Sequence, residues 1–202
     1  MGKIMVLGTK DGKFHPMKII AALGDTLGDY EFEYTSDIDR ILELDKHPIF
    51  ICFLDLWQME MSEKYSDALK KYMEDGGNIL SIHSGICIAN FTGSEGLHGA
   101  KFTGHPDICE ISIKLIPGHP ITDGLQDFCV NDEPYHFDVF GQITVLANYE
   151  YEGNTMPAAW EHKYGKGTLV YLMPGHDEAV FQNESYKKLI ESSINYLNKC
   201  RS

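Results

Sequence analysis

The sequence predicts an α/β domain in which a parallel sheet carries helices on both faces. Short apolar runs at 3–8, 48–54 and 78–82 do not alternate with polar residues, which is typical of strands buried on both faces. Segments with apolar residues at helical spacing lie between these runs. Strands and helices therefore follow one another as βαβαβαβ over the first half of the chain, and this order indicates parallel strands joined by helices.

Local signals set the limits of the elements in this first half. Pro16 suits the first turn of a helix, where its missing N–H costs nothing. Ser62 is a good N-cap, and the Gly76-Gly77 pair ends the helix that Ser62 begins. We expect strands at 3–8, 32–34, 48–54 and 78–82, and helices that begin near Pro16, Asp37 and Ser62.

The second half of the chain has a different pattern. Residues 110–116 alternate between apolar and polar types, as expected for a half-exposed strand. The sequence shows no repeat, linker or low-complexity tract, so residues 1–202 are expected to form a single domain. We expect a short helix at 86–91, a glycine-rich loop at 92–106, strands at 143–147, 158–161 and 168–172, and a closing helix at 184–199.

Composition argues against several classes of protein. The formal net charge of −13 argues against a nucleic-acid partner, because phosphate binding needs clustered Lys and Arg. No stretch approaches the roughly 20 apolar residues of a membrane-spanning helix, and the start of the chain lacks the features of a signal peptide. The five cysteines are odd in number and form no C-x-x-C pair, which favours a reducing, cytoplasmic setting.

The stretch Gly76–Gly85 indicates where a site should form. A buried strand that breaks into a glycine turn and then a helix presents one side chain at the carboxyl edge of the sheet. Open α/β sheets bind their ligands at that edge. Acyl-transfer enzymes place a Ser or Cys nucleophile at the tip of such an elbow. In this sequence the residue at the tip is His83.

Two further histidines follow predicted strands. His15 comes after the first strand and His176 after the last, so both are expected at the same sheet edge as His83. Loops can bring His105 and Glu133 to this place. A single histidine in a loop is more often a hydrogen-bonded structural residue, and we interpret four others in that way: His47, His98, His119 and His162.

Seven short motifs extend over most of the chain. They are GGNILSIHS at 76–84, FTGHP at 102–106, HPIT at 119–122, DEPY at 132–135, AW at 159–160, YGKG at 164–167 and GH at 175–176. In this order they resemble the motifs of ThuA-like (trehalose utilisation) proteins. The resemblance implies a flavodoxin-like three-layer sandwich with a mostly parallel sheet, related to the class I glutamine amidotransferases. It also implies a role in carbohydrate metabolism.

The elbow differs from that of the amidotransferases at one position. Those enzymes carry G-x-C-x-G, and the equivalent residues here are Ser81–Gly85, so that His83 stands in place of the cysteine. Attack on a glutamine amide needs a thiolate, and glutaminase activity is therefore not expected. Ser84 is not a convincing substitute, because Ile82 and Ile86 occupy the positions where G-x-S-x-G has glycines.

The leading interpretation is an enzyme that acts on a sugar or keto-sugar by acid–base chemistry. Imidazole titrates near neutrality, so a histidine at the sheet edge can both accept and donate a proton. Isomerisation, elimination and hydrolysis beside a carbonyl all remain open. We assign catalytic roles to His83, Glu133 and His176, and substrate contacts to His15, Ser84, His105, Asp132 and His136.

Three alternatives stay open. Imidazoles and a carboxylate at one site also suit a divalent zinc, manganese or iron ion, although the sequence has no H-E-x-x-H motif. A scaffold without its nucleophile is also what a non-catalytic sugar-binding or regulatory module would have. Asp132 and Glu133 could equally belong to a solvated loop. Besides a small carbohydrate, a second copy of the chain is a partner that the sequence allows.

Overall fold

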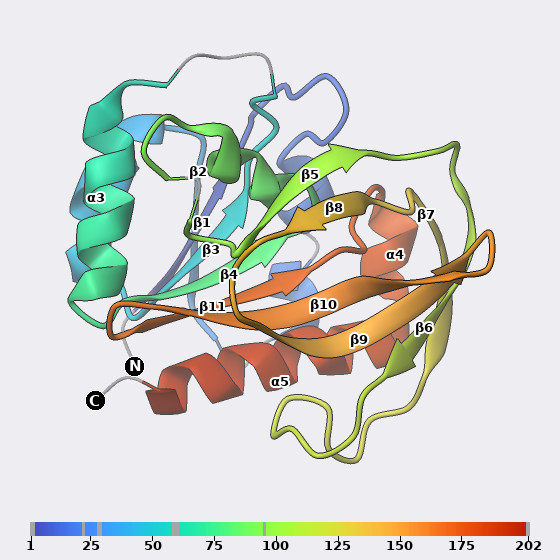
Figure 1. Ribbon diagram of the computed structural model, residues 1–202. Coiled ribbons are helices and arrows are strands. Elements are labelled where there is room, and N and C mark those ends of the chain that lie inside the picture. The colour runs from blue at the N-terminus through green and yellow to red at the C-terminus, as the bar shows by residue number, and fades with distance from the viewer. Residues whose placement is uncertain (1–2, 22, 28–29, 58–60, 95, 201–202) are drawn as a thin grey trace.

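Within the residues that a computed structural model describes (3–21, 23–27, 30–57, 61–94 and 96–200), the main sheet has nine strands (Figure 1). Their order is β2-β1-β3-β4-β11-β10-β9-β6-β7. The strands are β1 (Ile4–Gly8), β2 (Phe32–Thr35), β3 (Ile49–Phe53), β4 (Asn78–Ile82), β6 (Cys109–Leu115), β7 (Phe128–Asp132), β9 (Ile143–Tyr151), β10 (Asn154–Tyr164) and β11 (Gly167–Leu172).

One half of this sheet is parallel, as the sequence predicts. Strands β2, β1, β3, β4 and β11 pair in parallel. Every residue of β1, β3 and β4 is buried, and β1 and β3 are uninterrupted apolar runs. Strand β4 includes two polar residues, Asn78 and Ser81, whose side chains have buried hydrogen-bond partners.

The other half is antiparallel, so the prediction of a mostly parallel sheet is wrong and the sheet is mixed. Strands β10, β9, β6 and β7 pair antiparallel with their neighbours, and β10 also pairs antiparallel with β11. Tight turns join β9 to β10 and β10 to β11, where parallel pairing would need a crossover connection. Glu152 and Gly153 both have positive φ, +49° and +78°, as the favoured two-residue hairpin turn requires.

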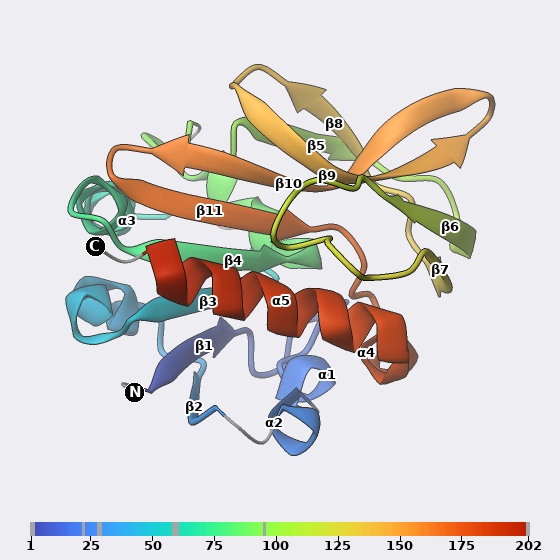
Figure 2. The same cartoon turned by 90° about the horizontal axis from the view of Figure 1, so that it is seen from below.

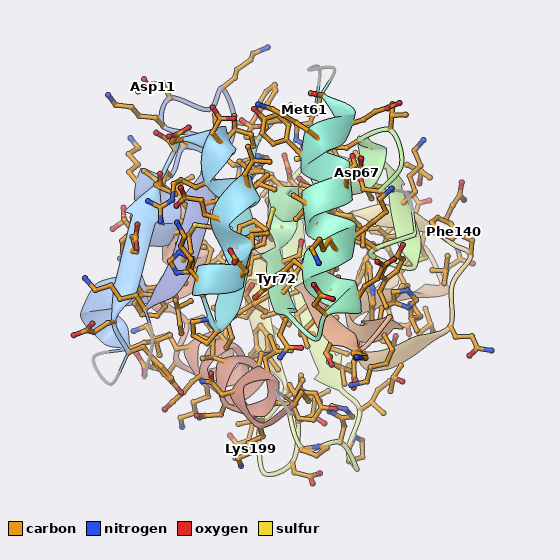
Figure 3. The ribbon with its side chains drawn as sticks, turned by 90° about the vertical axis from the view of Figure 1, so that its left-hand side faces the viewer. Asp11, Met61, Asp67, Tyr72, Phe140 and Lys199 are labelled. Atoms are coloured by element: carbon orange, nitrogen blue, oxygen red, sulfur yellow. The ribbon has the colours of Figure 1, made fainter. Side chains whose placement is uncertain are left out.

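Helices cover both faces of the parallel half. The α3 helix (Glu63–Glu74) and the 3-10 segment η1 (Ile38–Lys46) lie side by side on one face (Figure 3). The α5 helix (Glu184–Cys200) packs against β3, β4 and β11 on the other face (Figure 2). This three-layer arrangement is consistent with the expected flavodoxin-like α/β fold. Shorter helices are α1 (Lys18–Ala21), α2 (Leu23–Thr26) and α4 (Glu178–Gln182).

The segment expected to be a glycine-rich loop contains a strand. Residues 92–106 include β5 (Ala100–Gly104), which pairs antiparallel with β8 (His136–Val139) in a separate two-stranded sheet. The short helix expected at 86–91 is the 3-10 segment η2 (His83–Asn90), which begins directly at the elbow. In the described part of the chain, no helix is both long enough and apolar enough to cross a membrane.

Candidate functional site

The elbow between β4 and η2 holds His83 in an unusual backbone conformation. His83 has a φ of +48°, in the left-handed region that residues other than glycine rarely adopt. Gly85 lies so close to β3 that a Cβ at this position would clash with the carbonyl oxygen of Cys52. The chain therefore keeps the sharp strand-to-helix turn of a nucleophile elbow, with an imidazole at its tip.

Four side chains that each follow a different strand come together at one place. His15 follows β1, His83 follows β4, His176 follows β11, and Glu133 follows β7. One nitrogen or oxygen atom from each residue lies within 4.8 Å of the corresponding atoms of the others. The prediction that His15, His83 and His176 converge at one place is confirmed. We call these four residues the histidine–glutamate cluster.

The distances inside the cluster are short. His83 Nε2 lies 3.0 Å from His15 Nε2, which lies 3.2 Å from His176 Nδ1. Glu133 Oε2 lies 3.2 Å from His176 Nδ1, 3.4 Å from His83 Nε2 and 3.7 Å from His15 Nε2. His83, His15 and Glu133 are buried, whereas His176 is partly exposed. The four polar atoms thus face one another in a largely enclosed space.

A second set of groups orients the cluster from behind. His83 Nδ1 donates to the carbonyl oxygen of Met173 at 2.7 Å, which leaves Nε2 as the atom that faces the cluster. Asp55 Oδ1 lies 3.7 Å from His15 Nδ1, while Asp55 Oδ2 accepts from the backbone N–H groups of Phe14 and His15. Asp55 therefore fixes the backbone at His15, and its second oxygen lies near the ring beyond hydrogen-bond distance.

Asp132 ties the two loops that carry Glu133 and His176. Its Oδ1 accepts from the backbone N–H of Glu133 at 2.7 Å, and its Oδ2 accepts from the N–H of Gly175 at 2.6 Å. The side chain is completely buried. The structure thus places Asp132 behind the cluster, with its oxygens already occupied by backbone amides.

The environment shifts the pKa values of three cluster members. Burial opposes ionisation of Glu133, but the three neighbouring imidazoles outweigh it and hold the pKa of this carboxyl far below its usual range. The Glu133 carboxylate raises the pKa of His176, and burial lowers the pKa of His15. Glu133 is therefore a carboxylate at neutral pH.

Two members of the cluster, His15 and Glu133, line a cavity of about 400 Å³. Aromatic rings make much of this wall, and the Tyr135 ring stacks on His83 with 4.4 Å between centroids and 28° between planes. Trp57 lies 4.7 Å from the ring of Phe102. Such a cavity, largely apolar with a few convergent polar groups, is typical of small-molecule sites. Its lining residues are Phe14, His15, Trp57, Phe102, Gly104, His105, Glu133 and Tyr135.

The remaining predicted site residues lie at different distances from the cluster. His105 lies in the cavity wall, and its Nε2 is 3.7 Å from Glu133 Oε1. Ser84 is buried beside His83, and its Oγ has no hydrogen-bond partner in the described part of the chain. His136 is not part of the cluster, because it lies on β8 with its ring against Tyr151.

Sequence reasoning missed Asp55 and Tyr135. Asp55 comes one residue after an apolar run that was expected to end at 54, so the rule that placed His15 and His176 at the sheet edge could have found it. The four histidines interpreted as structural have protein partners: His47 with Lys3, His98 with Ser81, His119 with Glu161, and His162 with Gln142 and Gly96.

The fold and this site define an α/β protein whose strand–turn–helix elbow carries a histidine within a histidine–glutamate cluster. The model of the family described as ThuA, trehalose utilisation, matches residues 3–197. The chain belongs to this family, which confirms the resemblance seen in its motifs. A search of curated proteins finds no match.

Solved structures share the fold. A ThuA-like protein from Parabacteroides merdae has a TM-score of 0.81 at 14% identity, covering 98% of this chain and 90% of that one. A ThuA-like protein from Bacteroides uniformis has a TM-score of 0.76 at 16% identity, covering 97% and 91%. The β-galactosidase from Rahnella sp. R3 matches with a TM-score of 0.73 at 14% identity, over 98% of this chain but 31% of that enzyme.

Proposed function

We propose that this protein is a cytoplasmic enzyme of carbohydrate metabolism that acts on a sugar or keto-sugar through the histidine–glutamate cluster. The observation that carries the proposal is the convergence of three imidazoles and one carboxylate beside an aromatic cavity, whose wall includes His15 and Glu133 of this cluster. Titratable groups held at such short distances in a cleft are typical of catalytic sites. Trehalose utilisation, the description of the family, supports a carbohydrate as the substrate.

The shape and lining of the cavity suit a sugar. A volume of about 400 Å³ is in the range of small-molecule sites. The rings of Trp57, Phe102 and Tyr135 offer apolar surface to the C–H faces of a pyranose. His105 and Glu133 in the same wall offer polar contacts to hydroxyl groups.

Proton transfer beside a carbonyl is the chemistry we propose. Imidazole and carboxylate groups within hydrogen-bond reach of one another are the usual means of moving protons to and from a bound substrate. We assign His83, Glu133 and His176 to the reacting atoms, and His15 and His105 to substrate contacts. The assignment of substrate contacts to Ser84, Asp132 and His136 remains a prediction.

Glutaminase activity does not fit this site. Burial raises the pKa of Cys52 to about 12 and raises that of Cys87 well above its ordinary value. Both thiols contact backbone carbonyl oxygens in the core, Cys52 that of Gly85 and Cys87 that of Leu54. Neither cysteine can therefore supply the thiolate that attack on an amide requires.

A non-catalytic sugar-binding module is the second candidate. The observation that favours it is that the His83 side chain has no exposed surface and stacks on the ring of Tyr135. In that case the aromatic wall and His105 would bind the sugar, and no bond would change.

Turnover and binding must be measured together. The protein would be incubated with a panel of sugars and 3-keto sugars, with products followed by NMR and binding by calorimetry. We expect turnover by the wild type and its loss in His83→Asn and Glu133→Gln, with near-native circular dichroism. Asn is chosen because it tolerates the left-handed backbone at position 83. Binding without turnover would favour the second candidate, and the absence of both would contradict the two proposals.

A further inference from the structure

The four atoms of the histidine–glutamate cluster have the spacing of ligands around one metal ion. A tetrahedral zinc ion with bonds of about 2.0–2.1 Å places its ligand atoms about 3.3–3.4 Å apart. Five of the six distances between the cluster atoms lie between 3.0 and 3.7 Å. The cluster therefore surrounds a point at which an ion would be within bonding distance of all four residues.

Hydrogen bonds within the protein do not satisfy all the polar atoms of the histidine–glutamate cluster. Nε2 of His15 lies 3.0 Å from Nε2 of His83 and 3.2 Å from Nδ1 of His176, but it carries at most one proton and can donate to only one of them. Among the residues that the structure describes, none makes a well-directed hydrogen bond to the buried Glu133 Oε2, although three imidazole nitrogens lie within 3.7 Å of it. An unpaired buried carboxylate oxygen is costly unless a cation faces it.

Carboxylates behind the imidazoles complete the pattern of a metal site. Histidine ligands of metals almost always direct their second nitrogen at a carboxylate or a carbonyl oxygen. Here Nδ1 of His15 lies near Asp55, and Nδ1 of His83 contacts Met173 and lies 3.9 Å from Asp132. Glu133, Asp55 and Asp132 together also give this part of the molecule carboxyl groups on several sides, which favours a cation.

We infer that His15, His83, Glu133 and His176 form a binding site for one divalent transition-metal ion, and that zinc fits its geometry best. The inference deepens the proposed function. The role of the ion in a reaction rests on that function, whereas binding of the ion does not. With four protein ligands, a bound ion would polarise a substrate carbonyl in the adjoining cavity only by accepting its oxygen as a fifth ligand. The three residues assigned to the reacting atoms would then act as ligands, and His105 would be the imidazole left to carry a proton.

Metal binding can be measured without any substrate. The full-length protein would be stripped with a chelator, incubated with Zn²⁺, and passed over a desalting column before elemental analysis. We expect about one ion per chain in the wild type, and loss of the retained ion in Glu133→Gln and His176→Asn. Asp55→Asn should retain the site with affinity about 10- to 100-fold lower, because it removes a group behind a ligand. His119→Gln, which alters a histidine–glutamate pair outside the cluster, is the matched control and should bind like the wild type.

A second measurement does not depend on variants that could fail to fold. Co²⁺ in a four-coordinate nitrogen–oxygen site gives intense visible absorption, and we expect these bands to saturate at one equivalent and to disappear when Zn²⁺ is added. Fewer than about 0.1 ions retained, or equal retention by the wild type and well-folded Glu133→Gln and His176→Asn, would overturn the inference. Because these readouts use no sugar, a negative result here leaves sugar turnover to be judged separately.

Discussion

The Nε2 atoms of His15 and His83 lie 3.0 Å apart although the two residues are separated by 68 positions in the sequence. This contact exists because β1 and β4 run in parallel on either side of β3 and end at the same edge of the sheet. The backbone at His83, the close approach at Gly85 and the buried carboxyl group of Asp132 all support it. Each of these supports leads to a separate prediction.

The left-handed backbone of His83 should make glycine a better replacement than alanine. Both His83→Gly and His83→Ala remove the imidazole, its hydrogen bond to Met173 and its contact with Tyr135. The steric cost of the left-handed conformation, about 1–2 kcal/mol for alanine, exceeds the extra backbone entropy lost by glycine, about 0.5–1 kcal/mol. The glycine variant should therefore be more stable by roughly 0.5–1 kcal/mol in urea denaturation. Greater stability of the alanine variant would show that the strain at the elbow is absent.

Gly85 should not tolerate a methyl group. A Cβ at Gly85 would clash with the carbonyl oxygen of Cys52 in the buried strand β3, which has no room to move. We expect Gly85→Ala to lower the free energy of unfolding by about 1–3 kcal/mol, as overpacking of a core does. Gly96→Ala is the control, because its Cβ would meet only Tyr164 at 3.7 Å. If the two variants unfold at the same urea concentration, the close packing under the elbow is not real.

Asp132 should act as a positioning residue for the cluster. Asp132→Asn keeps the shape of the side chain but sets its N–H₂ group against one of two backbone N–H donors, that of Glu133 or that of Gly175. We expect a loss of about 1–3 kcal/mol in the free energy of unfolding, measured by chemical denaturation. Zn²⁺ affinity, measured by calorimetry at a temperature where the variant is folded, should fall about 10- to 100-fold. Asp138→Asn, at an exposed carboxylate on β8, should change neither quantity.

Protonation of Glu161, which lies outside the cluster, should lower the free energy of unfolding at acidic pH. Burial opposes its ionisation, but Lys163, His119 and Tyr196 face the carboxyl and hold its pKa below the ordinary value of 4.5. The folded-state pKa is lowered, so this contribution to stability is complete above pH 4.5 and is lost as the pH falls through the folded-state value. The difference in unfolding free energy between wild type and Glu161→Gln should therefore shrink below pH 4.5. A difference that stays constant from pH 7 to the acid transition would contradict this assignment.

The sequence predicted the parallel half of the fold well because burial on both faces leaves a clear pattern. The runs that became β1 and β3 contain no polar residue, and β4 contains Asn78 and Ser81. The antiparallel half depends on tight turns, such as the one at Glu152-Gly153, whose backbone conformation is a weak signal in a single sequence. Strand β5 was missed because its pairing with β8 is distant in the chain.

The site was predictable where strand ends supplied it. His15, His83 and His176 each follow a strand of the parallel half, so the shared edge of the sheet brings them together. The role of Asp132 could not be read in this way, because the direction of its side chain depends on how the loop after β11 packs against β7. The stacking of Tyr135 on His83 likewise arises from tertiary packing alone.

The central claim is that four distant residues make one site for one ion. It is tested most directly by soaking crystals of the protein in Zn²⁺ and collecting diffraction data on both sides of the zinc absorption edge. We predict a single strong anomalous peak within about 2.0–2.2 Å of His15 Nε2, His83 Nε2, His176 Nδ1 and Glu133 Oε2. No peak at this position, with the four side chains ordered and in contact with one another, would contradict the account.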